Sequence, residues 1–278
     1  MLTLRKSAAS IAFRVVLPIL GLGAAACTAA RPAPPAAPLK PLRAATLDEV
    51  LAAYDAYCES GTTLSASGNL DVRDRRTGKG RSLGVRVIAS RGGKLYLKGS
   101  VSVITAVEVV SNGERFWFQV PSRKTVWTGA AAGEARDAGT EDAPYQALRP
   151  SDVTSALLPE PLAPREGETV LLDADRESFT LTLAAPSQGR GVVRRRVSVD
   201  RDTLAPIRLR RYDERGDLET DVTLSAWTAG QPHQVDIRRP AQGYEASLRL
   251  DKVERNVPAP ERAFAPRTPE GYTVVEVR

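Results

Sequence analysis

The stretch VEVVSNGERFWFQV, residues 107–120, decides the fold that this sequence predicts. Apolar residues alternate with polar ones on both sides of Asn112-Gly113. A tight turn between two strands needs central residues that tolerate positive φ, and Asn-Gly is a pair that does so readily. We therefore predict a hairpin of two antiparallel strands that is closed by Asn112-Gly113.

The same alternation continues outward from this hairpin, between residues 64 and 127 and again between residues 169 and 253. In residues 218–226 the even-numbered side chains are mostly apolar and the odd-numbered ones are polar. This pattern is typical of an antiparallel sheet with one face in water. Because a flat sheet of about eleven strands would have to curl, the predicted fold is mainly β with α, an antiparallel half-open β-barrel of about eleven strands.

Two helices are predicted beside the strands. Thr46 and Glu49 form the pattern of a capping box, and apolar residues recur at helical spacing until Gly61. They predict a leading N-terminal helix with one apolar side. A short second helix is predicted from Pro150 to Leu158, because proline is favoured at the first helical position and Pro159 stops the helix. We expect this short helix to form a lid.

The N-terminal residues have the pattern of an export signal. Three cations and no acid accompany the apolar run from Val15 to Ala25, which is shorter than the roughly 20 residues that span a bilayer. Small residues then lead to Cys27, so residues 1–26 are predicted to be a lipoprotein signal peptide and Cys27 the lipidated residue. The alternative is an ordinary signal peptide that leaves Cys27 as a free thiol. Because Thr28 follows rather than Asp, resemblance to bacterial lipoproteins implies the outer membrane, with the chain facing the periplasm.

The rest of the chain divides into a tether and a domain. Residues 27–45 contain five prolines, which favour an extended chain. The folded domain is predicted over residues 46–278. Only Cys27 and Cys58 are present, so lipidation of Cys27 leaves Cys58 without a disulfide partner and predicts that it is a small core residue.

Composition argues against several functions. Without the three cations of residues 1–26, the chain has 36 basic and 33 acidic residues. Their signs are interleaved along the chain, so no nucleic-acid surface is predicted. The single histidine, His233, argues against a His-based metal site. Because no catalytic or phosphate-binding motif occurs in the sequence, we predict neither enzymatic activity nor a cofactor.

Several turn and strand patterns resemble the LolA/LolB family of periplasmic lipoprotein carriers and outer-membrane lipoprotein acceptors. They are residues 67–70 (SGNL), 113–117 (GERFW), 199–209 (VDRDTLAPIRL), 216–220 (GDLET), Asn256-Val257-Pro258, Phe264 and Gly271-Tyr272. The resemblance covers roughly residue 47 to the C-terminus. It implies a half-open barrel whose helices form a lid over a hydrophobic cavity for acyl chains. With a lipidated Cys27, the chain is similar to the membrane-anchored acceptor of this family rather than to the soluble carrier.

The predicted ligand site follows from these expectations. An acyl cavity needs apolar lining, since each buried polar group without a partner costs about 1 to 3 kcal/mol. The candidates for this lining are Phe116, Phe118, Val120, Val222, Leu224, Leu248 and Leu250. The predicted lid or mobile loop consists of Val101, Val103 and Ile104, together with Leu157 and Leu158. The alternative for all of them is a closed core.

Clusters of charge are weaker candidates. Arg194-Arg195-Arg196 suggests a site for phosphate or a lipid head group, but alternation sends Arg195 to the face opposite its two neighbours. A solvated strand is the favoured interpretation. The acidic groups at 173–175 and 200–202 are predicted to form turns rather than calcium loops, because they lack the ligand spacing of such loops.

The function expected from the sequence is that of an outer-membrane lipoprotein that binds acyl chains, such as palmitate, of lipids or lipoproteins without covalent chemistry. The expected partners are these lipids or lipoproteins, the outer membrane through the lipid anchor, and a periplasmic carrier protein. The alternative is a sensor or scaffold lipoprotein with a closed core that binds a protein partner.

Overall fold

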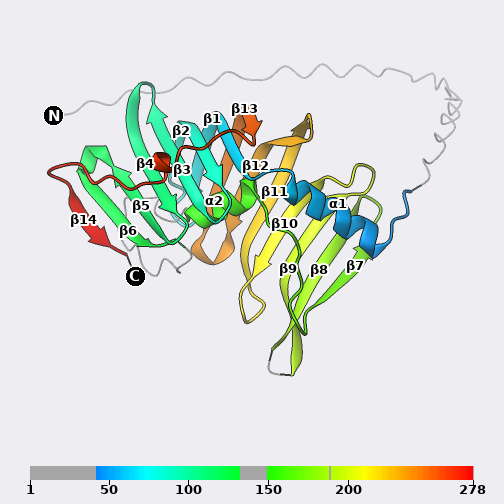
Figure 1. Ribbon diagram of the computed structural model, residues 1–278. Coiled ribbons are helices and arrows are strands. Elements are labelled where there is room, and N and C mark those ends of the chain that lie inside the picture. The colour runs from blue at the N-terminus through cyan, green and yellow to red at the C-terminus, as the bar shows by residue number, and fades with distance from the viewer. Residues whose placement is uncertain (1–41, 132–148, 188, 278) are drawn as a thin grey trace, which may run out of the picture. The chain divides into compact units, whose positions relative to one another are not determined.

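The computed structural model describes residues 42–131, 149–187 and 189–277 (Figure 1). The predicted signal peptide, Cys27 and most of the predicted tether lie outside these residues. The described helices are α1 (Leu47–Glu59) and α2 (Pro150–Leu157), with short 3-10 turns η1 (Pro121–Arg123), η2 (Pro240–Gln242) and η3 (Glu261–Ala263). The described strands are β1 (Thr63–Asp74), β2 (Gly80–Ser90), β3 (Lys94–Val101), β4 (Ile104–Asn112), β5 (Arg115–Val120), β6 (Thr125–Ala130), β7 (Thr169–Ala174), β8 (Ser178–Ser187), β9 (Arg190–Asp200), β10 (Pro206–Tyr212), β11 (Leu218–Thr228), β12 (Gln231–Arg239), β13 (Tyr244–Arg255) and β14 (Thr273–Glu276).

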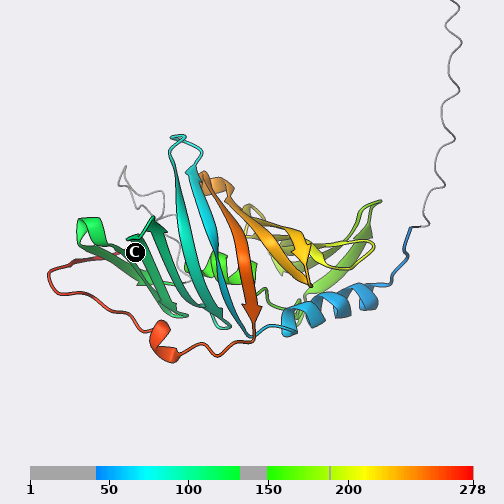
Figure 2. The same cartoon turned by 90° about the horizontal axis from the view of Figure 1, so that it is seen from above.

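All fourteen of these strands belong to one sheet, in the order β14-β6-β5-β4-β3-β2-β1-β13-β12-β11-β10-β9-β8-β7. Strands β1 to β6 form an antiparallel meander that runs outward from the middle of the sheet. Strands β7 to β13 form a second antiparallel meander that runs inward from the other edge. The antiparallel pair β1 and β13 joins the two halves, and Figure 2 shows these strands side by side.

The sheet corrects the predicted barrel of about eleven strands. It has fourteen strands, and the end strands β14 and β7 do not pair with each other in the described strand order. One strand that the pattern did not reveal is β14, which pairs in parallel with β6. The four residues of β14, TVVE, are too few to predict a strand and do not alternate between apolar and polar, and the partner of β14 is distant in the sequence.

The hairpin at Asn112-Gly113 is confirmed. Ser111 of β4 pairs with Phe116 of β5 across it. Only Gly113 of the two turn residues has a positive φ, of 98°. The side chain of Asn112 instead accepts hydrogen bonds from the backbone N–H groups of Glu114 and Arg115, at 2.9 and 2.8 Å, so it stabilises the turn as a hydrogen-bond acceptor.

Both predicted helices are confirmed to within two residues of their ends. Thr46 and Glu49 form the capping box of α1, with 2.7 Å between the Thr46 nitrogen and Glu49 Oε2. Pro150 lies in the first turn of α2. Cys58 is buried, and burial raises the pKa of its thiol to about 11. The thiol is therefore protonated at neutral pH, as expected of a small core residue.

The two helices pack on the same face of the sheet, which we call the inner face. Val50 and Tyr54 of α1 are buried against β8 and β9. Val153 and Leu157 of α2 are buried against the strands in the middle of the sheet. Leu209 of β10 packs against both groups, so the apolar core continues from one helix to the other. The opposite side of the sheet is the outer face.

The pairing that joins the two halves is irregular at Gly68. The register of β1 against β13 shifts between Ser67 and Gly68. A Cβ atom on Gly68 would overlap the backbone carbonyl oxygen of Arg249 in β13. Glycine at this position therefore lets the two strands approach closely.

Replacement of this glycine tests the junction. Gly68→Ala is expected to lower the free energy of unfolding by about 1 to 3 kcal/mol, because a clash with backbone atoms forces the strands to shift. The control is Gly84→Ala in β2, whose Cβ would lie 3.8 Å from the carbonyl oxygen of Ser100. Urea unfolding measures both losses, and equal losses would contradict a special role for Gly68.

Candidate functional site

All seven predicted cavity residues lie on the inner face, on β5, β11 and β13. They belong to one apolar cluster, in which Leu224 and Leu248 lie in one row across the sheet with Val235 between them. The row continues through Leu70 into the first half of the sheet. Five of the seven are buried, namely Phe118, Val222, Leu224, Leu248 and Leu250, while Phe116 and Val120 are partly buried.

Helix α2 covers this apolar cluster. Its residues Val153, Ala156 and Leu157 are buried against the strands, and so is Leu158 directly after it. The predicted lining residues therefore belong to the same apolar cluster as α2, which itself lies against β2, β3, β4 and β12. The apolar face that they form is continuous, and a helix of only eight residues lies on it.

The first turn of α2 is held to the sheet by charges. Asp152 has no exposed side-chain surface and forms ion pairs with Arg211 of β10 at 2.9 Å and Arg239 of β12 at 3.2 Å. Glu219 of β11 binds the same two arginines at 2.9 and 3.4 Å. It also binds Arg149, which precedes α2, at 3.3 Å. We call these five residues the ionic cluster.

Burial makes the ionic cluster sensitive to the loss of Arg149, Asp152 or Arg239. Arg239 is 1 % exposed. Burial, together with nearby Arg239, lowers the pKa of Arg149. Burial would lower the pKa of Arg211 too, but the carboxylates of Asp152 and Glu219 outweigh it and raise that pKa. Removing one partner of a buried ion pair costs about 3 to 5 kcal/mol, because the other charge is left without compensation.

The chain that follows α2 is also held in place. Arg195 of β9 donates hydrogen bonds to the backbone carbonyl oxygens of Glu160 and Pro161, at 2.8 and 3.1 Å. The hydroxyl of Tyr54 in α1 donates to the Glu160 carbonyl at 3.1 Å. Both ends of α2 are therefore attached to the inner face by polar contacts, while its middle is attached by apolar ones.

A small cavity lies on the inner face beside the ionic cluster. Its volume is about 140 Å³. Val197, Leu209 and Val222 contribute apolar lining, and Arg195 and Arg211 contribute positive charge. Ligand sites usually have roughly 300 to 1,000 Å³, so this cavity does not have room for an acyl chain while α2 is in place.

The predicted lid residues form two separate groups. Leu157 and Leu158 are buried in the apolar cluster. Val101, Val103 and Ile104 instead lie at the tip of the β3–β4 hairpin, where they are 55 %, 97 % and 72 % exposed. These three apolar side chains are directed to solvent, and we call them the apolar tip.

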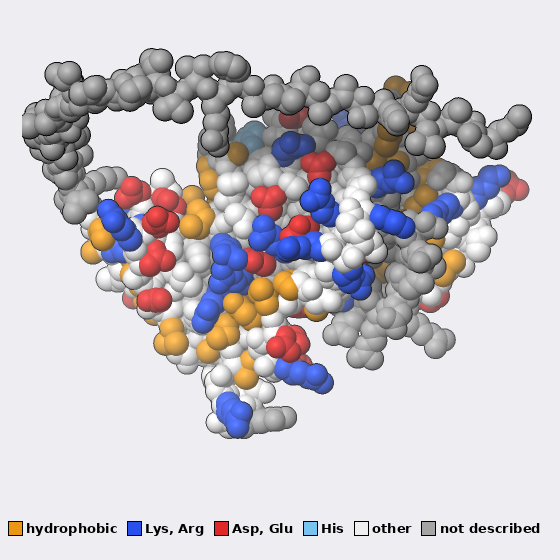
Figure 3. Space-filling model, turned by 180° about the vertical axis from the view of Figure 1, so that it is seen from behind, with side chains coloured by type: hydrophobic (Ala, Val, Ile, Leu, Met, Phe, Trp, Pro, Cys, Tyr) orange, Lys and Arg blue, Asp and Glu red, His pale blue; other side chains and the backbone are white. Residues whose placement is uncertain are grey.

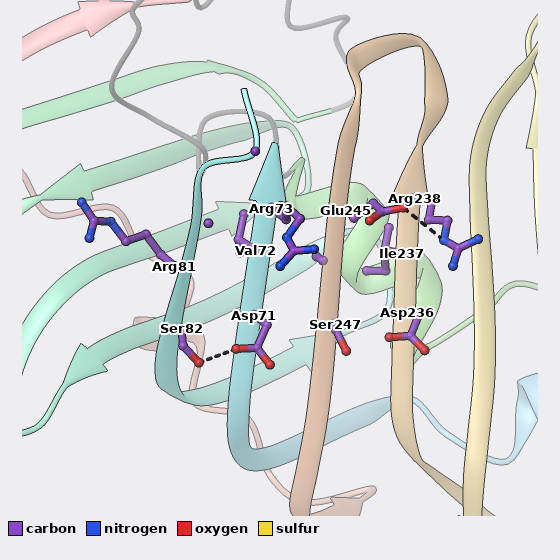
Figure 4. Close-up of a pocket in the computed structure, with 13 residues that line it drawn as sticks. Asp71, Val72, Arg73, Arg81, Ser82, Asp236, Ile237, Arg238, Glu245 and Ser247 are labelled. Atoms are coloured by element: carbon purple, nitrogen blue, oxygen red, sulfur yellow. Dashed lines mark hydrogen bonds and ion pairs between the residues drawn. The ribbon is translucent and has the colours of Figure 1, made fainter. Parts of the chain in front are cut away.

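The outer face carries a larger depression of about 620 Å³, lined by residues of β2, β1, β13 and β12 (Figure 4). Ser82 donates a hydrogen bond to Asp71 there, and Arg238 and Glu245 form an ion pair at 3.5 Å. Seen from behind, Lys and Arg side chains gather over the middle of the molecule with acidic side chains among them (Figure 3). Such polar surroundings do not suit a hydrocarbon ligand.

Sequence reasoning missed the ionic cluster. Alternation assigns Glu219 to the polar face of its strand, but the register shifts as Arg211 pairs with Thr220 and Tyr212 pairs with Leu218. Glu219 is the extra residue of this β-bulge, and such a bulge re-aims a side chain. Of the three consecutive arginines, Arg195 pairs with Arg211 on the inner face, whereas Arg194 lies at a shift of register between β8 and β9. What the sequence could not reveal is that Arg195 and Arg211 lie beside Asp152.

The chemistry available on the inner face is apolar surface and charge. The described residues contain no group of three His, Cys, Asp or Glu residues that could hold a metal ion. None of the described helices is long and apolar enough to cross a membrane. This arrangement is suited to noncovalent binding of an apolar group.

Comparison with known proteins identifies similar folds. The sequence matches no protein-family model and no curated protein. The solved structure of a DUF1329 family protein from Desulfovibrio piger is similar to this chain, with 17 % identity and a TM-score of 0.51 over 78 % of this chain and 97 % of that one. It shows a shared fold. A LolA superfamily protein from Nitrosomonas europaea is also similar, with 11 % identity and a TM-score of 0.48 over 80 % and 99 % of the two chains.

The contribution of the ionic cluster to the free energy of unfolding can be measured. Asp152→Asn is expected to lower the free energy of unfolding by about 3 kcal/mol, because Arg239 is left buried without full compensation. The control is Asp71→Asn on the outer face, whose ion pair with Arg249 is partly exposed and is expected to contribute less than about 1 kcal/mol. Similar losses in denaturant unfolding of the two variants would show that the ionic cluster does not hold α2.

Proposed function

We propose that this chain is an outer-membrane lipoprotein, facing the periplasm, that binds acyl chains of lipids or lipoproteins on its inner face. The acyl chain takes the place of α2. The observation that carries this proposal is a continuous apolar face that is covered by a helix of eight residues. The resemblance to the LolA/LolB family supports the same function.

The exchange of α2 for an acyl chain is physically reasonable. The helix buries Val153, Ala156 and Leu157 on the inner face, and an acyl chain offers the same kind of surface. Burial of each methylene contributes about 0.8 kcal/mol. A long chain can therefore compensate both the lost burial of the α2 side chains and the cost of about 3 to 5 kcal/mol for breaking the buried ion pair. The ligand therefore competes with α2 for one surface, and the balance decides whether it binds or is released.

Attachment to the membrane is proposed to involve two features. The first is the lipid on Cys27, with the Pro-rich tether of residues 27–45 between the lipid and the domain. The second is the apolar tip, which lies at the same end of the sheet as the β1–β2 turn with Arg75, Arg76 and Lys79. Apolar side chains beside cations suit the surface of an anionic bilayer. A periplasmic carrier protein is the partner proposed to deliver the cargo.

Weakening α2 tests the proposal. Leu157→Ala is expected to strengthen acyl-chain binding at least about tenfold, since it removes apolar contacts of the competitor, and 1.4 kcal/mol corresponds to a factor of ten. Val50→Ala removes a buried side chain from α1 instead and is expected to leave the affinity unchanged. Displacement of a fluorescent fatty acid and native mass spectrometry measure binding, with the full chain carrying Cys27→Ser so that no attached lipid interferes.

The same measurements can contradict the proposal. If the chain with Cys27→Ser contains no lipid after purification, and neither it nor the Leu157→Ala variant takes up a fatty acid, the inner face does not bind acyl chains. The alternative of a scaffold with a closed core would then apply.

The apolar tip gives a separate prediction. Val103→Ser is expected to reduce flotation of the Cys27→Ser chain with vesicles of phosphatidylethanolamine and phosphatidylglycerol severalfold. The free energy of unfolding is expected to stay the same within about 0.5 kcal/mol, because the side chain is exposed. Val274→Ser on β14, an exposed valine elsewhere, is the control. If the Cys27→Ser chain and its Val103→Ser and Val274→Ser variants float equally, the apolar tip does not contact the membrane.

A further inference from the structure

We propose that the acyl ligand carries an anionic head group, a carboxylate or a phosphate, which takes the place of the Asp152 carboxylate against Arg211 and Arg239. This inference rests on the proposed function, because it assumes that the acyl chain displaces α2. It adds the chemical class of the ligand, an anionic amphiphile rather than a neutral lipid.

Displacement of α2 removes two charges from the inner face. Asp152 lies in α2 and Arg149 directly precedes it, so these two charges leave together. Arg211, Glu219 and Arg239 lie on strands and remain. Among the described residues, Glu219 is then the carboxylate that still pairs with both arginines, each of which was bound to Asp152 at 2.9 or 3.2 Å.

Arg195 also loses hydrogen-bond partners when α2 is displaced. The carbonyl oxygens that accept hydrogen bonds from Arg195 belong to Glu160 and Pro161, in the chain directly after α2. When this chain moves with α2, Arg195 loses both acceptors. Among the described residues, the inner face then presents Arg195, Arg211 and Arg239 against two carboxylates, Glu219 and, near Arg195, Asp55 of α1, which is a net charge of +1.

A neutral ligand cannot compensate these charges. Arg239 is among the most deeply buried side chains, with 1 % of its surface exposed, and a buried charge without a partner is strongly unfavourable. A carboxylate or phosphate accepts charge-assisted hydrogen bonds from guanidinium groups in the same geometry as an aspartate. The displaced Asp152 thus leaves a position that an anionic head group fits.

The surface that would bind the head group and the surface that would bind the acyl chain lie side by side on the inner face. The small cavity of about 140 Å³ contains Arg195, Arg211 and Thr220 in its lining, and also Val222. Val222 belongs to the apolar cluster under α2 as well. The polar position and the acyl face are therefore contiguous on the inner face, as an amphiphile requires.

The test compares ligands that share a chain and differ in the head. Palmitate, hexadecyl phosphate and 1-hexadecanol are titrated against the full Cys27→Ser chain by displacement of a neutral fluorescent acyl probe. Both anions are expected to bind at least about tenfold more tightly than the alcohol, a difference of about 1.4 kcal/mol. Their relative affinities distinguish a carboxylate from a phosphate ligand.

Two matched variants locate the effect. Arg211→Gln is expected to reduce the ratio of palmitate to hexadecanol affinity severalfold, whereas Arg208→Gln is expected to leave it unchanged. Arg208 is on the outer face, where it pairs with Asp221, and its side chain is 39 % exposed, against 36 % for Arg211. The ratio is the readout because a loosened α2 raises both affinities together. Arg195→Gln serves in place of Arg211→Gln if the latter does not fold.

The outcomes separate the two proposals. If palmitate, hexadecyl phosphate and hexadecanol bind equally, and Arg211→Gln leaves the ratio unchanged, the inference of an anionic head group is overturned while the proposed acyl site stands. If none of the three binds, the proposed function itself fails. A ratio that falls equally in Arg208→Gln and Arg211→Gln reflects general charge and also overturns the inference.

Discussion

The arrangement of the inner face depends on the ion pairs of one buried carboxylate, that of Asp152. It fastens α2 to strands β10 and β12 through Arg211 and Arg239, and so keeps a helix of eight residues on an apolar surface. A helix this short is not stable alone in water. Its position therefore comes from the ionic cluster and from the packing of Val153 and Leu157, which act at different points along the helix.

The proposed exchange of α2 for a ligand depends on both kinds of contact. The apolar contacts can be replaced by any hydrocarbon of similar size, because the hydrophobic effect is not directional. The ion pairs can be replaced only by another anion, because Arg239 is buried and lies on β12 rather than on α2. The proposed ligand accordingly has an apolar chain for the first requirement and an anionic head for the second.

Much of the fold could be predicted from the sequence, because local sequence patterns specify it. The Asn112-Gly113 hairpin, the capping box at Thr46 and Glu49, and the short helix after Pro150 each rest on neighbouring residues, and the structure contains all three. The shared face of the seven predicted lining residues follows from the period of two in strands. The four residues of β14 and the bulge at Glu219 could not be predicted, because both depend on strand partners that are distant in the sequence or on a shift of register.

The sequence by itself determined most of the strands, the two helices and most of the side chains that face the core, because alternation, helical spacing and turn residues act over a few positions. It also supplies the pattern at Cys27 on which the proposed lipid anchor rests. Only the tertiary structure decided that α2 lies on the apolar face, that Val103 is exposed, and that Asp152 meets Arg211 and Arg239. These contacts join residues separated by tens of positions, and ion pairs at that distance in sequence leave no periodic signal.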